Sequence, residues 1–158
     1  MRKIIIDTDP GQDDALAMMT AFGAKKDLNV LGVTCVAGNV PLDLTSVNAL
    51  KICELSGVFS VPVFRGSPAP LKRKLITAEH VHGKTGLDGT DLSVKKKGLE
   101  RTDAVDFIVQ CTEKYRDEKI TICALGPLTN IAKVLKQDTV LTESIEEIVL
   151  MGGGFFEG

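Results

Sequence analysis

Residues 3–22 read KIIIDTDPGQDDALAMMTAF, and this stretch decides the fold class. Residues 3–7 are the first expected strand, and its unbroken run Ile4-Ile5-Ile6 is typical of a strand buried on both faces of a parallel sheet. Residues 13–22 follow with apolar side chains at helical spacing, and Gly23 is a common helix end. A buried strand that leads directly into a helix is the beginning of a β-α-β unit.

The same alternation continues along the chain. We expect further strands at 29–36, 61–64, 120–124 and 145–151, and further helices at 42–56, 103–115 and 128–136. This order predicts an α/β fold with a mostly parallel central sheet and helices on both faces. Right-handed crossovers then bring every strand-to-helix turn to one edge of the sheet, where ligands of such folds bind.

The pattern breaks from about residue 65 to residue 101, where Gly, Pro and Lys are frequent. A segment of this length without a period is usually functional or mobile, so we expect a lid-like loop. It carries both histidines of the chain, His80 and His82. A solvated, purely structural loop is the alternative. No linker divides the chain, so residues 1–158 are expected to form one unit.

Composition excludes several classes of protein. The chain has 158 residues, of which 44% are hydrophobic and 25% charged, as in soluble globular proteins. A net charge of −2 and the absence of Trp argue against nucleic-acid binding. No apolar stretch approaches the roughly 20 residues of a membrane span or forms a signal-peptide core, so we expect no membrane partner and a cytoplasmic location. The four cysteines form no C-x-x-C pair and are expected to be buried free thiols.

The end of the first strand is unusually acidic. Asp7, Asp9, Asp13 and Asp14 fall within eight residues that contain no Lys or Arg. Carboxylates this close repel one another unless a positive charge lies among them, and calcium or magnesium takes such oxygen ligands. Helix capping would explain Asp13 and Asp14, but it leaves the other two unexplained. The stretch therefore predicts a metal or ligand site.

Other strand ends add candidate groups to the same edge of the sheet. Gly38 and Asn39 follow the second strand, and residues 125–130 follow the fourth. The fifth strand ends in three glycines at 152–154, which permit close approach of the backbone to a ligand. These glycines lack the G-x-G-x-x-G spacing of a dinucleotide-binding loop.

The stretch DTDPGQDDA at 7–15 resembles the N-terminal signature of the inosine-uridine type nucleoside hydrolases. The similarity continues in the same order through VAGN at 36–39, HVHG at 80–83, GPLTNIA at 126–132 and VLMGGG at 149–154. The resemblance implies a Rossmann-like nucleoside hydrolase fold. It also implies hydrolysis of the N-glycosidic bond of ribonucleosides to ribose and free base, with calcium bound in the pocket and a role in nucleoside salvage.

The resemblance also implies roles for individual residues. Asp9, Asp14 and the backbone carbonyl of Leu125 would be calcium ligands. Asp9 would in addition act as the general base on a water molecule. Asp13 and Asn39 would hold the ribose hydroxyls.

Two further residues follow from the same motifs. Met151 would line the ribose pocket. His82, on the loop expected to close over the base, would assist departure of the leaving group. The carboxylates would stabilise the positive charge that develops on the ribose, as in glycoside hydrolysis generally.

The resemblance corresponds to the N-terminal half of family members, so we expect a truncated hydrolase that lacks part of its calcium shell. Weak calcium binding and impaired or absent hydrolysis would follow. Uncovered strand edges and apolar faces would favour a homo-oligomer.

Two alternatives stay open. One is a non-catalytic remnant or binding module that retains partial calcium or ribose affinity. The other is a phosphotransferase of the haloacid-dehalogenase type, whose D-x-D motif also ends a first strand. That motif expects Thr or Val where this chain has Gly11.

Overall fold

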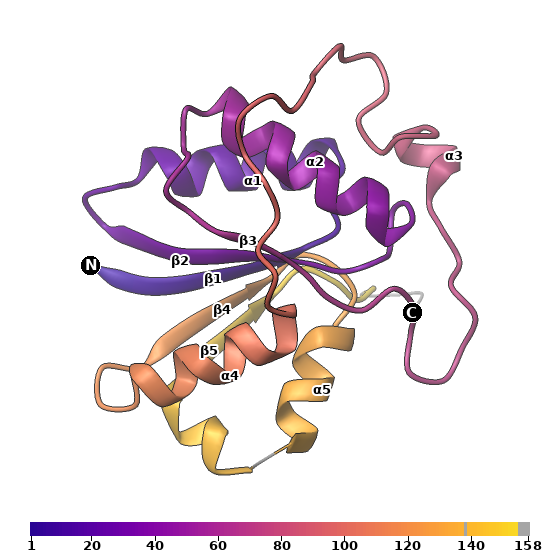
Figure 1. The fold of residues 1–158 in the computed structure, drawn as a ribbon. Helices are drawn as coiled ribbons and strands as arrows, with labels where there is room; N and C mark the ends of the chain where they lie inside the picture. The colour runs from indigo at the N-terminus through magenta and orange to yellow at the C-terminus, as the bar shows by residue number, and fades with distance from the viewer. Residues whose placement is uncertain (138, 155–158) are drawn as a thin grey trace.

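A five-stranded sheet with the order β3-β2-β1-β4-β5 forms the centre of the molecule (Figure 1). The computed structural model describes residues 1–137 and 139–154. Every neighbouring pair of strands in the sheet is parallel, so the predicted parallel sheet is confirmed. The strands are β1 (Arg2–Thr8), β2 (Leu28–Cys35), β3 (Val63–Arg65), β4 (Ile120–Ala124) and β5 (Ile145–Leu150).

Helices cover both faces of the sheet, as the sequence predicts. The helices α1 (Gln12–Gly23) and α2 (Leu42–Leu55) lie on one face, and α4 (Ala104–Lys114) and α5 (Thr129–Gln137) lie on the other (Figure 1). A 3-10 segment, η1 (Thr139–Ser144), leads into β5. The bounds differ from expectation mainly at β3, which begins after Pro62, because proline has no N–H to donate to a neighbouring strand.

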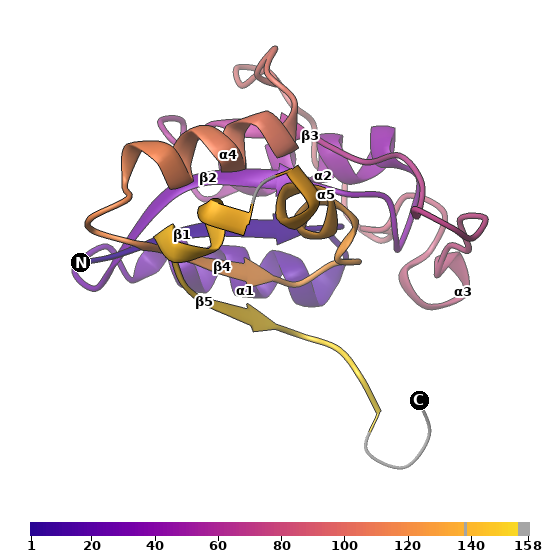
Figure 2. The ribbon, with the colours of Figure 1, turned by 90° about the horizontal axis from the view of Figure 1, so that it is seen from below.

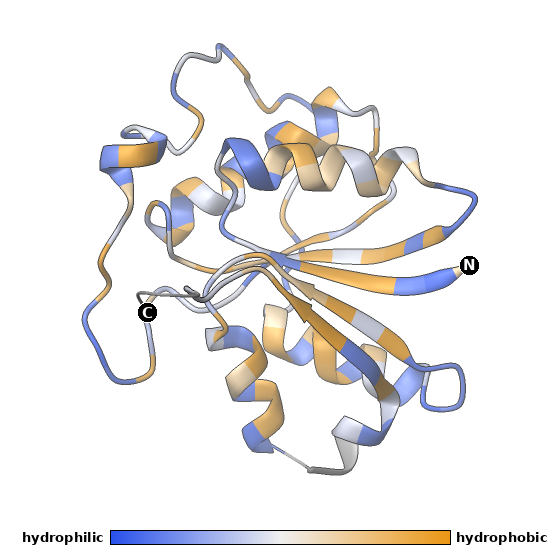
Figure 3. Ribbon diagram, turned by 180° about the vertical axis from the view of Figure 1, so that it is seen from behind, coloured by the Kyte–Doolittle hydropathy of each residue, from blue (hydrophilic) through white to orange (hydrophobic). Residues whose placement is uncertain are grey.

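The isoleucine run of β1 supplies both layers of the core. Ile4 and Ile6 pack with residues of α1 and α2, whereas Ile5 packs with residues of α4 and α5. Successive side chains of a strand point to opposite faces, so a strand covered on both sides must be apolar throughout. Figure 3 shows the strands of the sheet as predominantly hydrophobic.

The face of the sheet beside α1 is incompletely covered. The expected apolar stripe of α1 is wrong in part, since Phe22 is buried but Leu16 is 65% exposed. Leu16, Leu125, Val149 and other apolar side chains line a groove of about 560 Å³ between α1 and strands β4 and β5. Figure 2 shows β5 at the edge of the sheet, beyond β4. We call this hollow the α1–β5 groove.

The long segment between β3 and α4 packs along the molecule instead of extending freely. It contains a short helix, α3 (Glu79–His82), which the sequence did not predict. Leu87 is buried in the core. The backbone N–H groups of Lys95, Lys96 and Lys97 donate to the Glu54 carboxylate at the end of α2, and these hydrogen bonds lower the pKa of Glu54.

The cysteines are unpaired thiols, as expected. Cys35, Cys53 and Cys111 are buried, and Cys123 is half-buried beside the α1–β5 groove. Burial raises the pKa of the Cys53 and Cys111 thiols to about 11, so both are protonated at neutral pH. Among the described residues, no helix has the length and hydropathy needed to cross a bilayer.

Candidate active site

Asp9 lies just beyond β1, enclosed by the turns that follow β2 and β4. Its Oδ2 accepts a hydrogen bond from the Asn39 backbone N–H at 2.7 Å, and the Asn39 side-chain amide donates to the Asp9 carbonyl at 2.9 Å. A Cβ at Gly38 would lie 2.0 Å from Asp9 Oδ2, and one at Gly126 would lie 2.6 Å from Oδ1. Only glycine at these two turns leaves room for the carboxylate.

Asp14 joins the first turn of α1 to the end of β1. Its Oδ1 accepts the Thr8 hydroxyl at 2.6 Å, and its Oδ2 accepts the Gly11 backbone N–H at 3.1 Å. The Asn39 amide lies 3.4 Å from the same Oδ2. Capping by Asp13 is wrong, because Gly11 is the N-cap of α1, whereas Asp14 accepts the Gly11 N–H from the first turn, and the same bonds hold its carboxylate next to that of Asp9.

Burial and the closeness of the two carboxylates disfavour their ionised forms. Burial raises the pKa of Asp9 to about 7, with a further contribution from the negative charge of Asp14. Burial also raises the pKa of Asp14. Buried anions of this kind are stabilised by a cation, and oxygen ligands suit calcium.

The described side chains alone supply too few ligands to complete the coordination shell of such a cation. Among residues 1–137 and 139–154, no group of three or more His, Cys, Asp or Glu side chains is arranged to hold a metal ion. The carbonyl of Leu125, in the turn after β4, is the additional ligand that the resemblance implies. The Leu125 and Gly126 N–H groups donate to the Asp7 carbonyl, at 2.8 and 3.3 Å, which fixes this turn beside β1.

Asp7 is separate from the other acidic residues. It is fully buried on the α4–α5 side of the sheet, where its Oδ1 accepts from Thr34 Oγ1 at 2.6 Å and Asn130 Nδ2 at 2.8 Å. Its Oδ2 has no hydrogen-bond partner among the described residues. Burial raises its pKa to about 6. Because Asn130 also accepts the Ser67 N–H and donates to the Cys35 carbonyl, Asp7 belongs to a structural network beneath the site.

A cavity of about 480 Å³ opens above Asp9 at the carboxyl ends of the strands. It brings together most of the residues that the motifs single out: Asp9, Asp13, Asn39, His82, Leu125 and Met151. Asp14 does not line it and lies beneath, bound to Thr8 and Gly11. Residues from five segments of the chain therefore meet where a doubly wound sheet binds its ligand.

The sequence model of the inosine-uridine preferring nucleoside hydrolases matches residues 4–158, nearly the whole chain. The chain belongs to this family. The chain is 46% identical, over 155 residues, to an uncharacterised protein of Schizosaccharomyces pombe, covering 98% of itself and 50% of that relative. It is 44% identical, over 157 residues, to a pyrimidine-specific ribonucleoside hydrolase of Escherichia coli, covering 99% of itself and 49% of that relative.

Solved structures agree with this assignment. A purine-preferring ribonucleoside hydrolase from Gardnerella vaginalis has a TM-score of 0.90 and 32% identity, with 97% of this chain and 49% of that chain covered. A plant nucleoside hydrolase has a TM-score of 0.86 and 37% identity, with 97% and 48% covered. The chain thus spans about half the length of the curated relatives it matches.

Sequence reasoning about this nucleoside hydrolase chain missed three contributors to the site. Thr8 fixes Asp14, Gly126 makes room for Asp9, and Gln12 contacts His82. All three lie inside motifs that the sequence analysis quoted, so their positions carried a signal. Gly126 and Gln12 contact residues far away in the sequence, which no single motif reveals, whereas Thr8 and Asp14 lie six residues apart in the same motif.

Proposed function

We propose that this chain carries the calcium- and ribose-binding part of a ribonucleoside hydrolase active site. The reaction is hydrolysis of the N-glycosidic bond to give ribose and a free base, which would enter salvage. The observation that carries the proposal is the placement of Asp9. Its carboxylate is enclosed by Gly38, Asn39 and Gly126 at the floor of the cavity, with its pKa raised to about 7.

Calcium fits the donor chemistry of this floor. Asp9, Asp14 and the Leu125 carbonyl would hold the ion, with water and ribose hydroxyls completing a shell of about 6–8 oxygens. Neutralisation of the Asp9–Asp14 repulsion is the physical reason for binding. When bound, calcium would lower the pKa of a water molecule and orient it toward the sugar.

The side chains of the cavity then have distinct tasks. Asp9 accepts the proton of the attacking water at its carboxylate. Asp13 and Asn39 accept and donate hydrogen bonds to ribose hydroxyls and hold the sugar for attack. The carboxylates stabilise the positive charge that develops on the ribose.

Met151 and His82 occupy other parts of the cavity wall. Met151 would pack against the ribose, and His82 would lie near the departing base. The relatives include both a pyrimidine-specific and a purine-preferring hydrolase, so we propose a ribonucleoside substrate without assigning the base.

We further propose that the chain by itself hydrolyses nucleosides less well than its longer relatives, and that it acts in the cytoplasm. The exposed apolar α1–β5 groove and the unpaired edge of β5 favour association with a second copy.

The proposal is tested by measuring free base released from inosine and from uridine, with and without calcium. We expect calcium-dependent release that Asp9→Ala reduces by about 10³-fold or more, as loss of a general base and metal ligand together requires. Asp117→Ala, an exposed aspartate in a surface turn, is the matched control and should retain the wild-type rate.

A non-catalytic binding module is the second candidate, favoured by the incomplete set of metal-binding side chains. It predicts that calorimetry detects calcium or ribose binding which Asp9→Ala removes, while no base is released. Absence of both binding and release would contradict both functions.

A further inference from the structure

The imidazole of His82 is held against the acidic motif by two contacts. Its Nδ1 lies 2.8 Å from Gln12 Oε1, in the first turn of α1. The ring also packs on Gly11, where an added Cβ would lie 2.5 Å from His82 Nδ1 and 2.8 Å from Cε1. The edge of the ring that carries Nδ1 therefore faces α1, and the residue lines the cavity above Asp9.

The backbone that carries His82 is also tied to the site. The Ala78 N–H donates to the Asn39 carbonyl at 2.9 Å, and the His82 N–H donates to the Ala78 carbonyl at 3.0 Å. The buried amide of Asn48 donates to the carbonyls of Pro10 and Thr85, at 3.2 and 2.7 Å. These bonds place α3 independently of Gln12.

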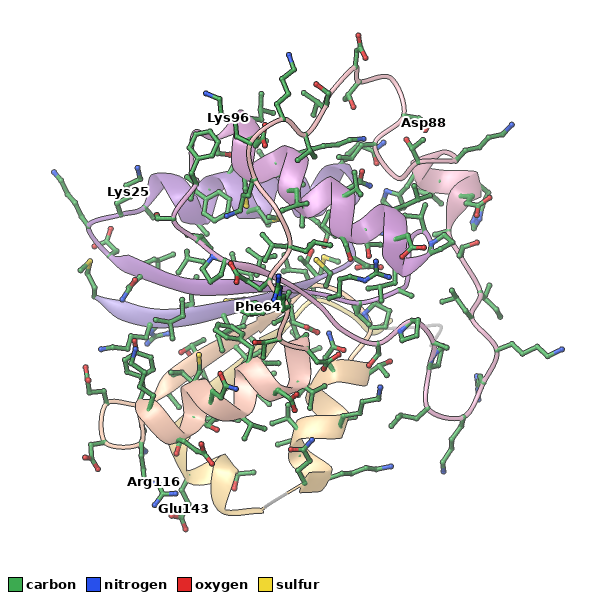
Figure 4. The ribbon with its side chains drawn as sticks, viewed as in Figure 1. Lys25, Phe64, Asp88, Lys96, Arg116 and Glu143 are labelled. Atoms are coloured by element: carbon green, nitrogen blue, oxygen red, sulfur yellow. The ribbon has the colours of Figure 1, made fainter. Side chains whose placement is uncertain are left out.

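The loop after α3 is closed by its own clamp. Asp88 accepts the Lys84 and Thr85 N–H groups, each at 3.0 Å, and Figure 4 shows it beside α3. Because these other bonds already hold the segment in place, the contact of Gln12 with His82 has a more specific role.

That task concerns the proton of the imidazole. An amide oxygen only accepts hydrogen bonds, so a neutral His82 bonded to Gln12 Oε1 must carry its hydrogen on Nδ1. We propose that Gln12 is a positioning residue that holds His82 in the Nδ1–H tautomer, which leaves Nε2 as the acceptor that the ring offers to a ligand. The inference deepens the proposed function, because His82 belongs to the wall of the same cavity.

This tautomer decides whether His82 accepts a hydrogen bond from a bound nucleoside or donates one to it. With Nε2 unprotonated, His82 can accept a hydrogen bond from a hydroxyl, a water or a base N–H, but it cannot donate one. A proton taken up at Nε2 can then be returned to the departing base, which converts the acceptor into a general acid. The opposite tautomer would present a donor from the start and would repel an N–H group of the substrate.

Nitrogen-15 NMR of the imidazoles tests this inference in the chain itself, without calcium or turnover. The spectra are recorded at a pH about two units above the reference histidine pKa of about 6.5. His80, exposed on the same short helix, is the internal reference. We expect His82 to show the hydrogen on Nδ1 and His80 to show the tautomer mixture of a solvated ring.

Two variants separate the tautomer from the fold. Gln12→Leu removes the acceptor from an exposed position, and we expect the His82 spectrum to shift to the His80 pattern. Gln12→Glu keeps an oxygen acceptor and should keep the Nδ1–H signal. Amide exchange of the His82 N–H, bonded to the Ala78 carbonyl, should stay slow in both variants.

Each other outcome overturns the proposal. A His82 hydrogen on Nε2 in the wild type, or an unchanged tautomer in Gln12→Leu, means that Gln12 does not set it. Loss of amide protection in Gln12→Leu means that Gln12 only anchors the segment. Because none of these measurements uses a nucleoside, absent hydrolysis would contradict the proposed function and leave this inference standing.

Discussion

The end of β1 and the end of β5 border the same cavity but are built in opposite ways. After β1, Asp9 is 5% exposed, and its carboxylate accepts a hydrogen bond from the Asn39 backbone N–H. After β5, Met151 is 55% exposed and belongs to the open α1–β5 groove. The polar half of the site is therefore preorganised in this chain, whereas its apolar half lies open.

Position in the sheet explains the difference. β1 has hydrogen-bonded neighbours on both sides and helices over both faces, so turns from β2 and β4 enclose whatever follows it. Within the described residues, β5 has a hydrogen-bonded neighbour on one side only. Buried polar groups need complete hydrogen bonding, and only a central strand supplies enough surrounding backbone to provide it. Four predictions test this contrast.

The largest expected effect is the pH dependence of stability that the buried Asp7 carboxylate causes. The pKa of Asp7 is raised from 3.8 to about 6, so the folded state binds its proton more tightly than the unfolded state does. Stability is therefore highest below about pH 4 and falls as pH rises to about 6, by about 3 kcal/mol for this group. Urea unfolding across that window measures the slope, and Asp7→Asn should make it shallower.

The raised pKa of Asp9 adds a loss of the same sign, which remains in Asp7→Asn, so the difference between the two curves isolates Asp7. Asp117→Asn, at an exposed turn, is the control and should keep the wild-type slope. Parallel curves for wild type and Asp7→Asn would show that the buried carboxylate carries no such cost.

The second effect is stabilisation by calcium. At neutral pH, calcium at about 100 times its dissociation constant should raise the free energy of unfolding by about 2.7 kcal/mol. Asp9→Asn should abolish this gain, because it removes a charged ligand and the repulsion that the ion relieves. Met151→Ala should retain the gain. Urea unfolding with calcium or with a chelator measures it, and equal gains in the two variants would remove the functional distinction between the strand ends.

The third effect compares truncations on the two sides of the cavity. Asn39→Ala removes the amide that donates to the Asp9 carbonyl, which should lower the free energy of unfolding by about 1–2 kcal/mol. Met151→Ala removes an exposed side chain and should change it by less than about 0.5 kcal/mol. Chemical denaturation of both variants measures the difference, and a larger loss for Met151→Ala would reverse the comparison.

The smallest effect on the folded monomer is expected at the edge strand. Val149→Lys places a charge in the α1–β5 groove, so it should weaken self-association while changing monomer stability by less than about 0.5 kcal/mol. Sedimentation velocity measures the association. Ile76→Lys, at an 86% exposed position outside the groove, is the control. Undiminished association of Val149→Lys would place the contact on another surface.

Much of this architecture could be predicted from local pattern. The run Ile4-Ile5-Ile6 indicated a strand buried on both faces, and a helix was expected from residue 103, where Asp103 caps α4 and accepts the Val105 N–H at 2.8 Å. Helix α3 was missed because a single turn has too few residues to show a period. The exposure of Leu16 was missed because periodicity identifies an apolar face but not whether another element covers it.

The sequence by itself determined the class of fold, the edge of the sheet that carries the chemistry, and the family, because period and motif are local properties of the chain. Only the tertiary structure separated Asp7 from Asp9, since alternation along β1 matters once helices lie on both faces. It also brought Gln12 to His82 across a separation of 70 residues. Contacts of this kind depend on how the strands are ordered in the sheet, which no local stretch of sequence encodes.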